Sequence, residues 1–315
     1  MNNRNLKIIF MGTPDLSATV LKGLADNGYN VVLCVSQPDK PVGRKHVLTA
    51  PPAKETALNL GIEVYQPDSL KTDEAYETVR SYEPDLIITA AYGKILPQRM
   101  LDIPVYGCIN VHASLLPGYR GAAPVQYSIM NGDDVTGVTI MKMDAGMDTG
   151  DILRQAEVSI DIDDTTDILM DKLAAAGRDL LLDTIEDYVE GRISPIPQDP
   201  SKVSVTSQIK PEDGIIDWSL SARQVHDRIR ALSTWPGCST VFNGKRMKIY
   251  SSTLDDSDIQ DDAKPGQIIP SAKCTLKVRC GEGAVFINEL QSEGGKRLKA
   301  SDCAHNYRPG QLFGV

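Results

Sequence analysis

The chain has 315 residues and a formal net charge of −9, with 41% hydrophobic and 24% charged residues. This length makes two domains the natural expectation, and the composition excludes a disordered, collagen-like or disulfide-rich chain. No apolar stretch reaches the about 20 residues that a membrane-spanning helix needs. The short apolar run near the N-terminus resembles a first strand and not a signal peptide. We therefore expect a cytoplasmic protein.

The first half of the chain alternates apolar runs with stretches of helical spacing. This alternation predicts an α/β fold with a doubly wound, Rossmann-like, mostly parallel sheet, whose active site lies at the carboxyl ends of the strands. Strands are expected at 6–11, 31–35, 62–65, 86–91, 108–112 and 138–143, and helices at 14–27, from 52, at 74–82 and at 165–189.

Residues 191–205 are rich in proline and polar residues, so we place a linker there, after a first domain over 1–190. The remainder, 206–315, has a different texture: one amphipathic helix is followed by short strand-like runs separated by glycine-containing turns. A small β-barrel or sandwich is the expected structure. The helix is expected at 221–232 and the strands at 248–250, 267–269, 275–278 and 284–290.

The six cysteines are scattered, with no C-x-x-C pair, so we expect free thiols and no metal site. The turn Gly12-Thr13-Pro14 ends a strand and opens a helix, as a dinucleotide site would. It lacks the second and third glycines of the G-x-G-x-x-G pattern, so nicotinamide or flavin binding is not expected.

Charge is distributed unevenly along the chain. Residues 206–315 hold 15 Lys and Arg against 13 Asp and Glu, and five of these acids fall in the polar segment 255–262. The remaining residues hold 18 Lys and Arg against 29 Asp and Glu. A basic second domain permits an RNA partner.

The most informative stretch is 107–151. Asn110 and His112 alternate along a strand and therefore point to one face. Taken alone, such a pair is more often a satisfied pair of core polar groups. Here it runs into an irregular loop, 114–121, that offers backbone N–H and C=O groups to a ligand, and a Gly-rich acidic turn, 144–151, follows the next strand. A carboxylate from that turn would hold His112 in its charged form.

These motifs, N-x-H, then SLLPGYRGAAP, then M-x-x-G-x-D-T-G-D, resemble the signature of the folate-dependent formyltransferases. The resemblance implies catalytic roles for Asn110, His112 and Asp148, and 10-formyltetrahydrofolate as formyl donor. It further implies folate-binding roles for residues of these two loops and of the segment 90–93, namely Ala90, Tyr92, Gly93, Ser114, Leu115, Leu116, Pro117 and Asp144.

The expected reaction is attack of an amine on the formyl carbon. Asn110 and protonated His112 would donate hydrogen bonds to the tetrahedral oxyanion, each such donor typically contributing about 10²–10³ in rate. Asp148 would hold the imidazole charged or take a proton from the amine through water. Neither a metal nor a covalent intermediate is required. His46, His226 and His305 are interpreted as surface or packing residues.

The acceptor must be chosen by other segments. The loop 37–46, with Lys40, Arg44 and Lys45, is either an exposed charged loop or a contact for an RNA acceptor end. It is similar to the loop with which methionyl-tRNA-specific members of the family engage the acceptor stem. The motifs IDWS at 216–219 and LSTWPG at 232–237 resemble the start of that family's OB-like, tRNA-binding C-terminal domain. Its candidate backbone-binding cations are Lys245, Arg246, Lys248, Lys273, Lys277, Arg279, Lys296, Arg297 and Lys299.

The resemblance thus implies formylation of initiator methionyl-tRNA for translation, by a protein that we expect to be a monomer with no membrane partner. The nearest alternative is a formyltransferase that acts on an amino-sugar nucleotide. Two others remain: a catalytically silent RNA- or folate-binding protein, which the intact trio disfavours, and an NAD-linked oxidoreductase, which the incomplete glycine pattern disfavours.

Overall fold

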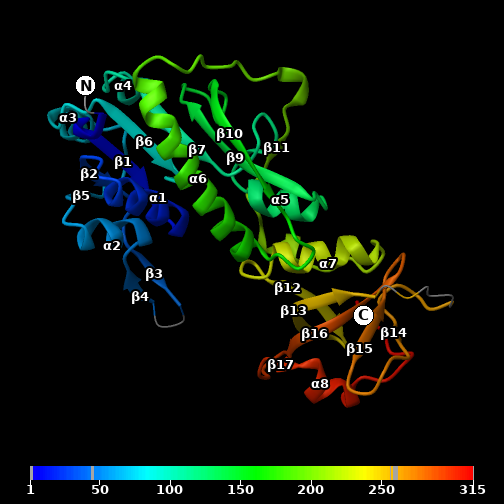
Figure 1. Cartoon of the computed structure of the whole chain (residues 1–315). Coiled ribbons are helices and arrows are strands. Elements are labelled where there is room, and N and C mark those ends of the chain that lie inside the picture. Colours follow the sequence, from blue (N-terminus) through cyan, green and yellow to red (C-terminus); the bar gives the residue numbers. More distant parts are fainter. Residues whose placement is uncertain (1–2, 44–45, 256, 258–261, 315) are drawn as a thin grey trace. The chain divides into compact units, whose positions relative to one another are not determined.

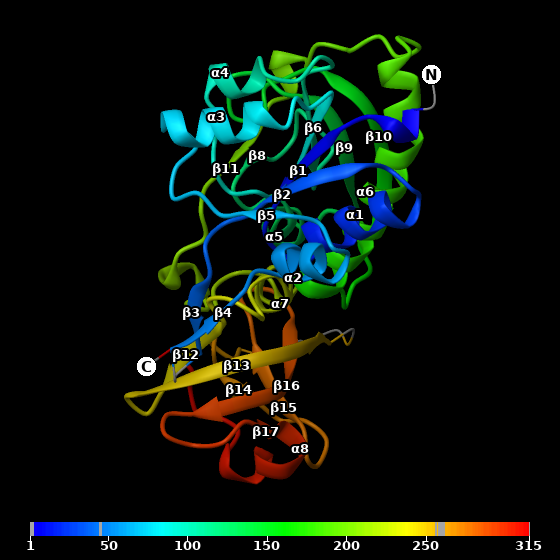
Figure 2. The ribbon, with the colours of Figure 1, turned by 90° about the vertical axis from the view of Figure 1, so that its left-hand side faces the viewer.

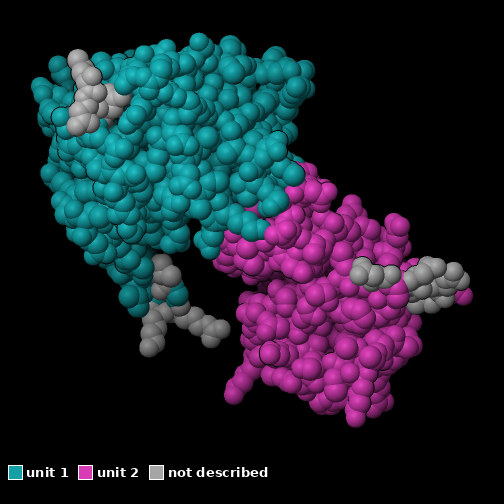
Figure 3. All heavy atoms as spheres, viewed as in Figure 1, with its two compact units in different colours: residues 1–121, 135–159, 170–205 teal, residues 122–134, 160–169, 206–315 magenta. Residues whose placement is uncertain are grey.

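The computed structural model describes residues 3–43, 46–255, 257 and 262–314, and the chain divides into two compact units (Figure 3). The first comprises residues 1–121, 135–159 and 170–205, and the second residues 122–134, 160–169 and 206–315. By this division the segment 191–205 lies within the first unit. The domain boundary that we placed in this segment stays a prediction.

A seven-stranded sheet forms the centre of the first unit, with the order β10-β9-β7-β6-β1-β2-β5 (Figure 1). Five neighbouring strands of this sheet, β7, β6, β1, β2 and β5, are parallel. Strand β9 pairs antiparallel with β7, and β10 pairs antiparallel with β9. This confirms the predicted doubly wound, mostly parallel fold. The strands are β1 (Ile8–Gly12), β2 (Val31–Val35), β5 (Val64–Tyr65), β6 (Leu86–Ala90), β7 (Cys108–His112), β9 (Val135–Lys142) and β10 (Ile152–Ser159).

Helices cover both faces of this sheet. Figure 2 shows α3 (Asp73–Ser81) and α4 (Gln98–Leu101) on one side, and α1 (Asp15–Asp26) and α6 (Thr166–Val189) on the other. Helix α6 can approach β7 and β9 closely because it presents Gly177, where a Cβ would lie 2.8 Å from Val111 Cγ1. A helix without a side chain at this point brings the two backbones together.

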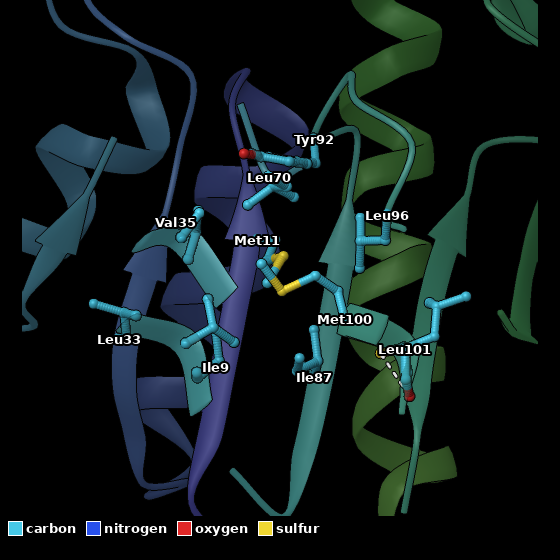
Figure 4. Packing of buried hydrophobic residues seen from close by; sticks show 13 residues of the cluster. Ile9, Met11, Leu33, Val35, Leu70, Ile87, Tyr92, Leu96, Met100 and Leu101 are labelled. Atoms are coloured by element: carbon cyan, nitrogen blue, oxygen red, sulfur yellow. Dashed lines mark hydrogen bonds between the residues drawn. The ribbon is translucent and has the colours of Figure 1, made fainter. Parts of the chain in front are cut away.

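The core between the sheet and helices α3 and α4 is shown in Figure 4. Ile9, Met11 and Ile87 alternate along β1 and β6 and are fully buried against Ala75, Val79 and Met100 of the two helices. Strand alternation therefore sends one set of side chains to this face and the intervening set toward α1. The Thr72 side chain caps α3 by accepting from Ala75 N, and Asp73 and Glu74 suit the positive end of the helix.

The second unit holds an antiparallel sheet of the order β12-β13-β16-β15-β14, with β17 paired to β16. The sheet curls into a half-barrel, consistent with the predicted OB-like domain. A cluster of aromatic rings packs inside the unit, with Trp218 stacked on Phe313 at 5.8 Å and Phe242 edge-on to Phe313 at 5.2 Å. Its strands are β12 (Cys238–Phe242), β13 (Lys245–Leu254), β14 (Ile268–Ile269), β15 (Leu276–Arg279), β16 (Ala284–Ser292) and β17 (Leu298–Lys299).

Helix α7 (Ala222–Ala231) packs on this sheet and begins with a capping box between Ser221 and Gln224. It carries His226, which is 2% exposed and hydrogen-bonded on both ring nitrogens, to Ser252 Oγ and to Ile162 O. Burial lowers the pKa of His226. This is the packing histidine that the sequence analysis expected, whereas His46 and His305 are exposed.

Several short elements escaped the sequence analysis. Strand β10 is an edge strand with alternate residues partly exposed, so it carries no continuous apolar run. None of the helices within the described ranges combines the length and the apolar composition needed to cross a bilayer. Helix α2 (Pro52–Asn59) is the helix that was expected from 52. The other short elements are β3 (Lys40–Val42), β4 (Val47–Thr49), β8 (Arg120–Gly121), β11 (Val205–Thr206), α5 (Pro124–Met130), α8 (Ala300–Cys303) and four 3-10 turns (Asn3–Asn5, Pro200–Lys202, Pro211–Gly214, Ala304–Asn306).

The core of the first unit generates a stability prediction. Truncating Ile87 to alanine should destabilise this unit by about 2–5 kcal/mol, because the cavity adds to the lost transfer free energy. The control is Val105→Ala, at a side chain that is 78% exposed, with an expected change within about 0.5 kcal/mol. Far-UV circular dichroism in denaturant is the measurement, since both tryptophans, Trp218 and Trp235, lie in the second unit. Equal midpoints for the two variants would contradict the assigned core.

Candidate active site

The carboxyl ends of β1, β6 and β7 meet at one edge of the parallel sheet, with Gly12 paired to Ala90 and Ala90 paired to Val111. Hydrogen bonds tie the loops that follow. Ser17 Oγ donates to Ala90 O at 2.6 Å, and Thr13 Oγ1 and Gln37 Nε2 both donate to Tyr92 O. The turn from Ala90 to Gly93 is therefore fixed by side chains from the two neighbouring strand ends.

Tyr92 carries an unusual buried hydroxyl in this turn. The residue is 3% exposed, and among the described residues no group makes a hydrogen bond to its Oη. Burial raises the pKa of Tyr92 to about 12, so the phenol keeps its proton and can donate. A buried polar atom without a partner is costly and rare in proteins, which marks this place as one where a ligand group can bind.

Asn110 lies on β7 and is oriented by its cross-strand neighbour. Thr89 on β6 is paired with Asn110 in the ladder, and Thr89 Oγ1 donates to Asn110 Oδ1 at 2.6 Å. With the oxygen of the amide engaged in this way, Nδ2 is left as the end that can donate to a substrate oxygen. The sequence analysis missed Thr89, although a threonine within the apolar run LIITA is a visible polar exception.

His112 ends the same strand and faces one acceptor at each ring nitrogen. Nδ1 lies 3.6 Å from Asp148 Oδ1, and Nε2 lies 3.2 Å from Tyr119 O. The His112 and Asp148 side chains are 8% and 18% exposed, so solvent screens their attraction little. Both neighbours are acceptors, one a carboxylate oxygen and the other a backbone carbonyl oxygen. The structure thus brings together His112 and Asp148, as predicted.

Asp148 is held on its other carboxylate oxygen by the loop after His112. Gly121 N donates to Asp148 Oδ2 at 2.8 Å. The backbone of Asp148 adopts a left-handed conformation, with φ +54°, that side-chain-bearing residues seldom occupy. Asp144, the other carboxylate predicted in this turn, is exposed and accepts from Gly146 N and Thr149 Oγ1, so it stabilises the turn itself.

The loop from Ser114 to Pro117 is braced from below by two polar side chains. Thr139 Oγ1 donates to Ser114 O and accepts from Leu116 N, and Gln155 Nε2 donates to Leu116 O. These backbone groups, which we expected to face a ligand, are therefore used to set the shape of the loop. Ser114 and Leu116 are buried, whereas Leu115 and Pro117 are partly exposed beside the site.

The predicted acceptor loop forms a short hairpin of β3 and β4. Lys40 is exposed on β3, whereas Arg44 and Lys45 lie outside the described residues. Lys54 Nζ and Gln66 Nε2 donate to the Asp39 carboxylate, just before β3. These two hydrogen bonds, and the one from Lys54 most, lower the pKa of Asp39. Asp39 thus anchors the base of the hairpin and is not itself part of a cationic surface.

The cations of the second unit divide into two groups. Lys277 pairs with Asp255 at 2.5 Å and Arg297 pairs with Glu289, so these two charges are largely used within the unit. Lys245, Arg246 and Lys248 lie exposed along β13. Lys273, Lys296 and Lys299 are exposed as well, so the accessible positive charge of this unit is not confined to β13.

Among the described residues, no group of three or more His, Cys, Asp or Glu side chains could hold a metal ion. The six cysteines form no disulfide. Burial raises the pKa of four thiols, Cys34, Cys108, Cys238 and Cys280, to about 12. Cys274 is the exposed one. The expected absence of a metal stays a prediction.

The chain matches known families over both halves. Residues 6–185 match the family described as "Formyl transferase", and residues 208–308 match "Formyl transferase, C-terminal domain". A methionyl-tRNA formyltransferase of Macrococcus caseolyticus is 48% identical over 94% of this chain and 94% of its own length. The methionyl-tRNA formyltransferase of Bacillus subtilis is 45% identical over 98% of each chain.

Solved structures show the same fold at much lower identity. An N-formyltransferase from Helicobacter canadensis, solved with folinic acid and dTDP-3-aminofucose, superimposes with a TM-score of 0.66 over 93% of this chain and all of its own, at 19% identity. Identity this low carries the fold alone.

The thiol environments yield a measurable prediction. In the native protein at pH 8, Cys274 should react with an aromatic disulfide reagent within seconds, because it is exposed, whereas the buried thiols should react only on unfolding. Cys274→Ser should abolish the fast phase, and Cys108→Ser should leave it unchanged. A fast phase of several thiols in the native protein would contradict the burial described above.

Proposed function

Because the chain belongs to the formyl transferase family, we propose that it transfers the formyl group of 10-formyltetrahydrofolate to the amino group of methionine on initiator tRNA. The observation that carries this proposal is identity of 48% and 45%, over nearly the full length, to relatives that are methionyl-tRNA formyltransferases. The site agrees with it, since an amide, an imidazole and a carboxylate gather at the strand ends.

The reaction makes a simple demand on the protein. The amine nitrogen attacks the formyl carbon, the bond from that carbon to N10 of the folate breaks, and N10 receives a proton while the amine loses one. Negative charge develops on the formyl oxygen in between. Asn110 Nδ2, held in place by Thr89, donates to that oxyanion from a rigid strand. Fixed donors of this kind stabilise the transition state without reorganising.

His112 and Asp148 supply the charge. The Asp148 carboxylate lies 3.6 Å from the His112 ring, and a positively charged imidazole at this place would stabilise the oxyanion. As the tetrahedral intermediate collapses, Asp148 accepts the amine proton through water, or keeps His112 charged while solvent takes it. Both roles require the carboxylate to stay beside the ring, so both depend on the contacts of Asp148 with Gly121.

The folate donor has a suitable place at this sheet edge. The turn of Ala90, Tyr92 and Gly93 presents the unpartnered Tyr92 hydroxyl, a donor that a heterocycle with several acceptors could satisfy. The loop Ser114–Pro117 follows the neighbouring strand β7, and Asp144 accepts a hydrogen bond within the turn that follows β9. We assign these residues to folate binding, with Leu115 and Leu116 as apolar contacts.

The tRNA is assigned to the segment 37–46, with Lys40, Arg44 and Lys45, and to the exposed cations of 206–315, the proposed tRNA-binding domain. The catalytic domain is 1–190 and the linker 191–205. Phosphate contacts by Lys and Arg would supply most of the affinity, so binding should weaken steeply with salt. We propose that the enzyme acts as a cytoplasmic monomer in the initiation of translation.

Transfer of labelled formyl tests the acceptor directly. Labelled 10-formyltetrahydrofolate is offered with initiator methionyl-tRNA and with a dTDP-amino sugar in competition. The proposal predicts N-formylmethionyl-tRNA as the product. Label on the sugar would favour the class of the Helicobacter canadensis enzyme, which here is a likeness at 19% identity only.

Removing any of the three polar groups should abolish most of the activity. Asn110→Ala, His112→Ala and Asp148→Ala are each expected to lower kcat by about 10²-fold or more, because each removes charge stabilisation that is made in the transition state. Binding of the unreactive analogue 5-formyltetrahydrofolate should change little. His305→Ala, an exposed histidine, is the control. A near-wild-type kcat for one variant would remove that residue from the mechanism.

The acceptor hairpin should affect tRNA and not folate. Arg44→Ala is expected to raise the KM for methionyl-tRNA by about 10-fold, the contribution of one charged contact of 1–2 kcal/mol, and to flatten the salt dependence of binding. Affinity for 5-formyltetrahydrofolate should stay unchanged. Lys71→Ala, an exposed lysine outside the hairpin, is the matched control. Equal losses of tRNA and folate affinity would mean that the hairpin has a structural role.

A further inference from the structure

The segment that we predicted to be a linker contributes a side chain to the catalytic turn. Gln198 Nε2 donates to Asp148 O at 2.9 Å and to Gly150 O at 2.7 Å. These two carbonyls flank Thr149 in the turn that carries the catalytic carboxylate. One amide therefore holds both ends of this short stretch, although Gln198 comes 50 residues after Asp148 and 48 residues after Gly150 in the sequence.

A second residue fixes which way this amide points. Arg120 Nε and one of its terminal nitrogens both donate to Gln198 Oε1, at 2.9 and 2.6 Å. A guanidinium can only donate, so Oε1 must face Arg120 and Nε2 must face the turn. All four hydrogen-bonding positions of the amide are then used. Such a saturated group is held far more rigidly than one with a single bond.

The surrounding segment is attached to the same loops by its backbone. Ile196 exchanges two hydrogen bonds with Ile152 at the start of β10, at 2.8 and 2.9 Å. Eight residues after Ile196, Ser204 O accepts from Arg120 N and Ser204 Oγ accepts from Tyr119 N. Gln198 therefore lies on a strap that is tied at both ends and cannot drift from the catalytic turn.

The turn needs such support because its own conformation is unfavourable. Asp148 has φ +54°, and a side-chain-bearing residue in this region costs on the order of 1–3 kcal/mol unless its surroundings impose it. Gly150 approaches the backbone so closely that a Cβ would lie 1.7 Å from Lys142 O. Without its clamp the turn would relax, and Asp148 would move away from His112 and Gly121.

We propose that Gln198 is a positioning residue for Asp148, oriented by Arg120, so that the strap 196–204 is part of the active site and more than a connection between domains. This inference rests on the proposed function for the role of Asp148 in catalysis. The positioning itself is a property of the folded chain and can be measured without the reaction.

The decisive variants are Gln198→Ala and Gln198→Glu. Glutamate has nearly the same shape and still accepts from Arg120, yet it places an acceptor oxygen against the two carbonyls where the amide donated. Both variants should lower kcat by about 10- to 100-fold, since a displacement of the order of 1 Å has this effect on catalysis. The KM for 10-formyltetrahydrofolate should change less than about 2-fold. A Gln198→Glu enzyme with wild-type kcat would overturn the proposal.

The neighbouring residue provides the control. Asp199 accepts from Ser201 N and Ser201 Oγ within its own turn and makes no contact with the 148–150 stretch among its hydrogen bonds. Asp199→Ala loosens the same segment locally, so its kcat should stay within about 2-fold of wild type. A loss equal to that of Gln198→Ala would mean that general disturbance of the segment, and not the amide, is responsible.

Two further measurements separate this proposal from the proposed function. In an Asp148→Asn background, adding Gln198→Ala should reduce the residual kcat by less than about 2-fold, because the two changes act through one group. Amide exchange at Gly121, whose N–H is bonded to Asp148, should be about 5- to 10-fold faster in Gln198→Ala, as expected for loss of one hydrogen bond. Unchanged exchange would refute the positioning role, even if wild-type enzyme proved unable to formylate methionyl-tRNA.

Discussion

The contact between His112 Nδ1 and Asp148 Oδ1, at 3.6 Å, is the interaction on which the rest of the site depends. It joins the end of the central strand β7 to the turn between β9 and β10. The backbone is strained at two residues beside His112. Asp148 has φ +54°, and Tyr119, whose carbonyl oxygen faces the other ring nitrogen, has φ +59°. Local backbone preference opposes both conformations. They persist because side chains distant in the sequence, Ser204 and Gln198, hold the two loops.

The site combines two ways of fixing a polar group. Asn110 belongs to a ladder of buried parallel strands and is aligned by Thr89, so its position is set by the sheet. Asp148 belongs to a turn and is held by hydrogen bonds from two separate segments, from Gly121 N and from Gln198 Nε2. A donor to the oxyanion gains most from rigidity, because its value comes from being in place before charge develops. The proposed charge partner lies in a loop, so its distance from His112 depends on these hydrogen bonds and not on the sheet.

The sequence pattern was sufficient for the fold, because buried strands such as 31–35 and 86–91 are continuous apolar runs and helices such as 14–27 have clear spacing. It was also sufficient to place Asn110 and His112 on one face. It failed where exposure and hydrogen bonding decide, as at the edge strand β10. Thr89 is visible as a polar residue in an apolar run, but its pairing with Asn110 appears only once the register of β6 and β7 is known. Gln198 is not distinguished by its type or neighbours until the path of 196–204 is known. For the loop around Leu116 the sequence predicted the position of the loop but not its hydrogen bonds. Leu116 N and O bind the side chains of Thr139 and Gln155.

The proposed reaction has a consequence for how the enzyme distinguishes its acceptor. In the proposed mechanism the three polar groups at the strand ends act on the formyl group and on the attacking amine, which every acceptor shares. Acceptors must then be distinguished by binding far from the reacting atoms, through differences in kcat/KM. The hairpin β3–β4 is suited to this, since it projects Lys40 together with Val47 and Leu48, which are 59% and 66% exposed. A cation beside apolar side chains would suit the proposed tRNA, with its phosphate backbone and unstacked bases, better than a compact sugar nucleotide.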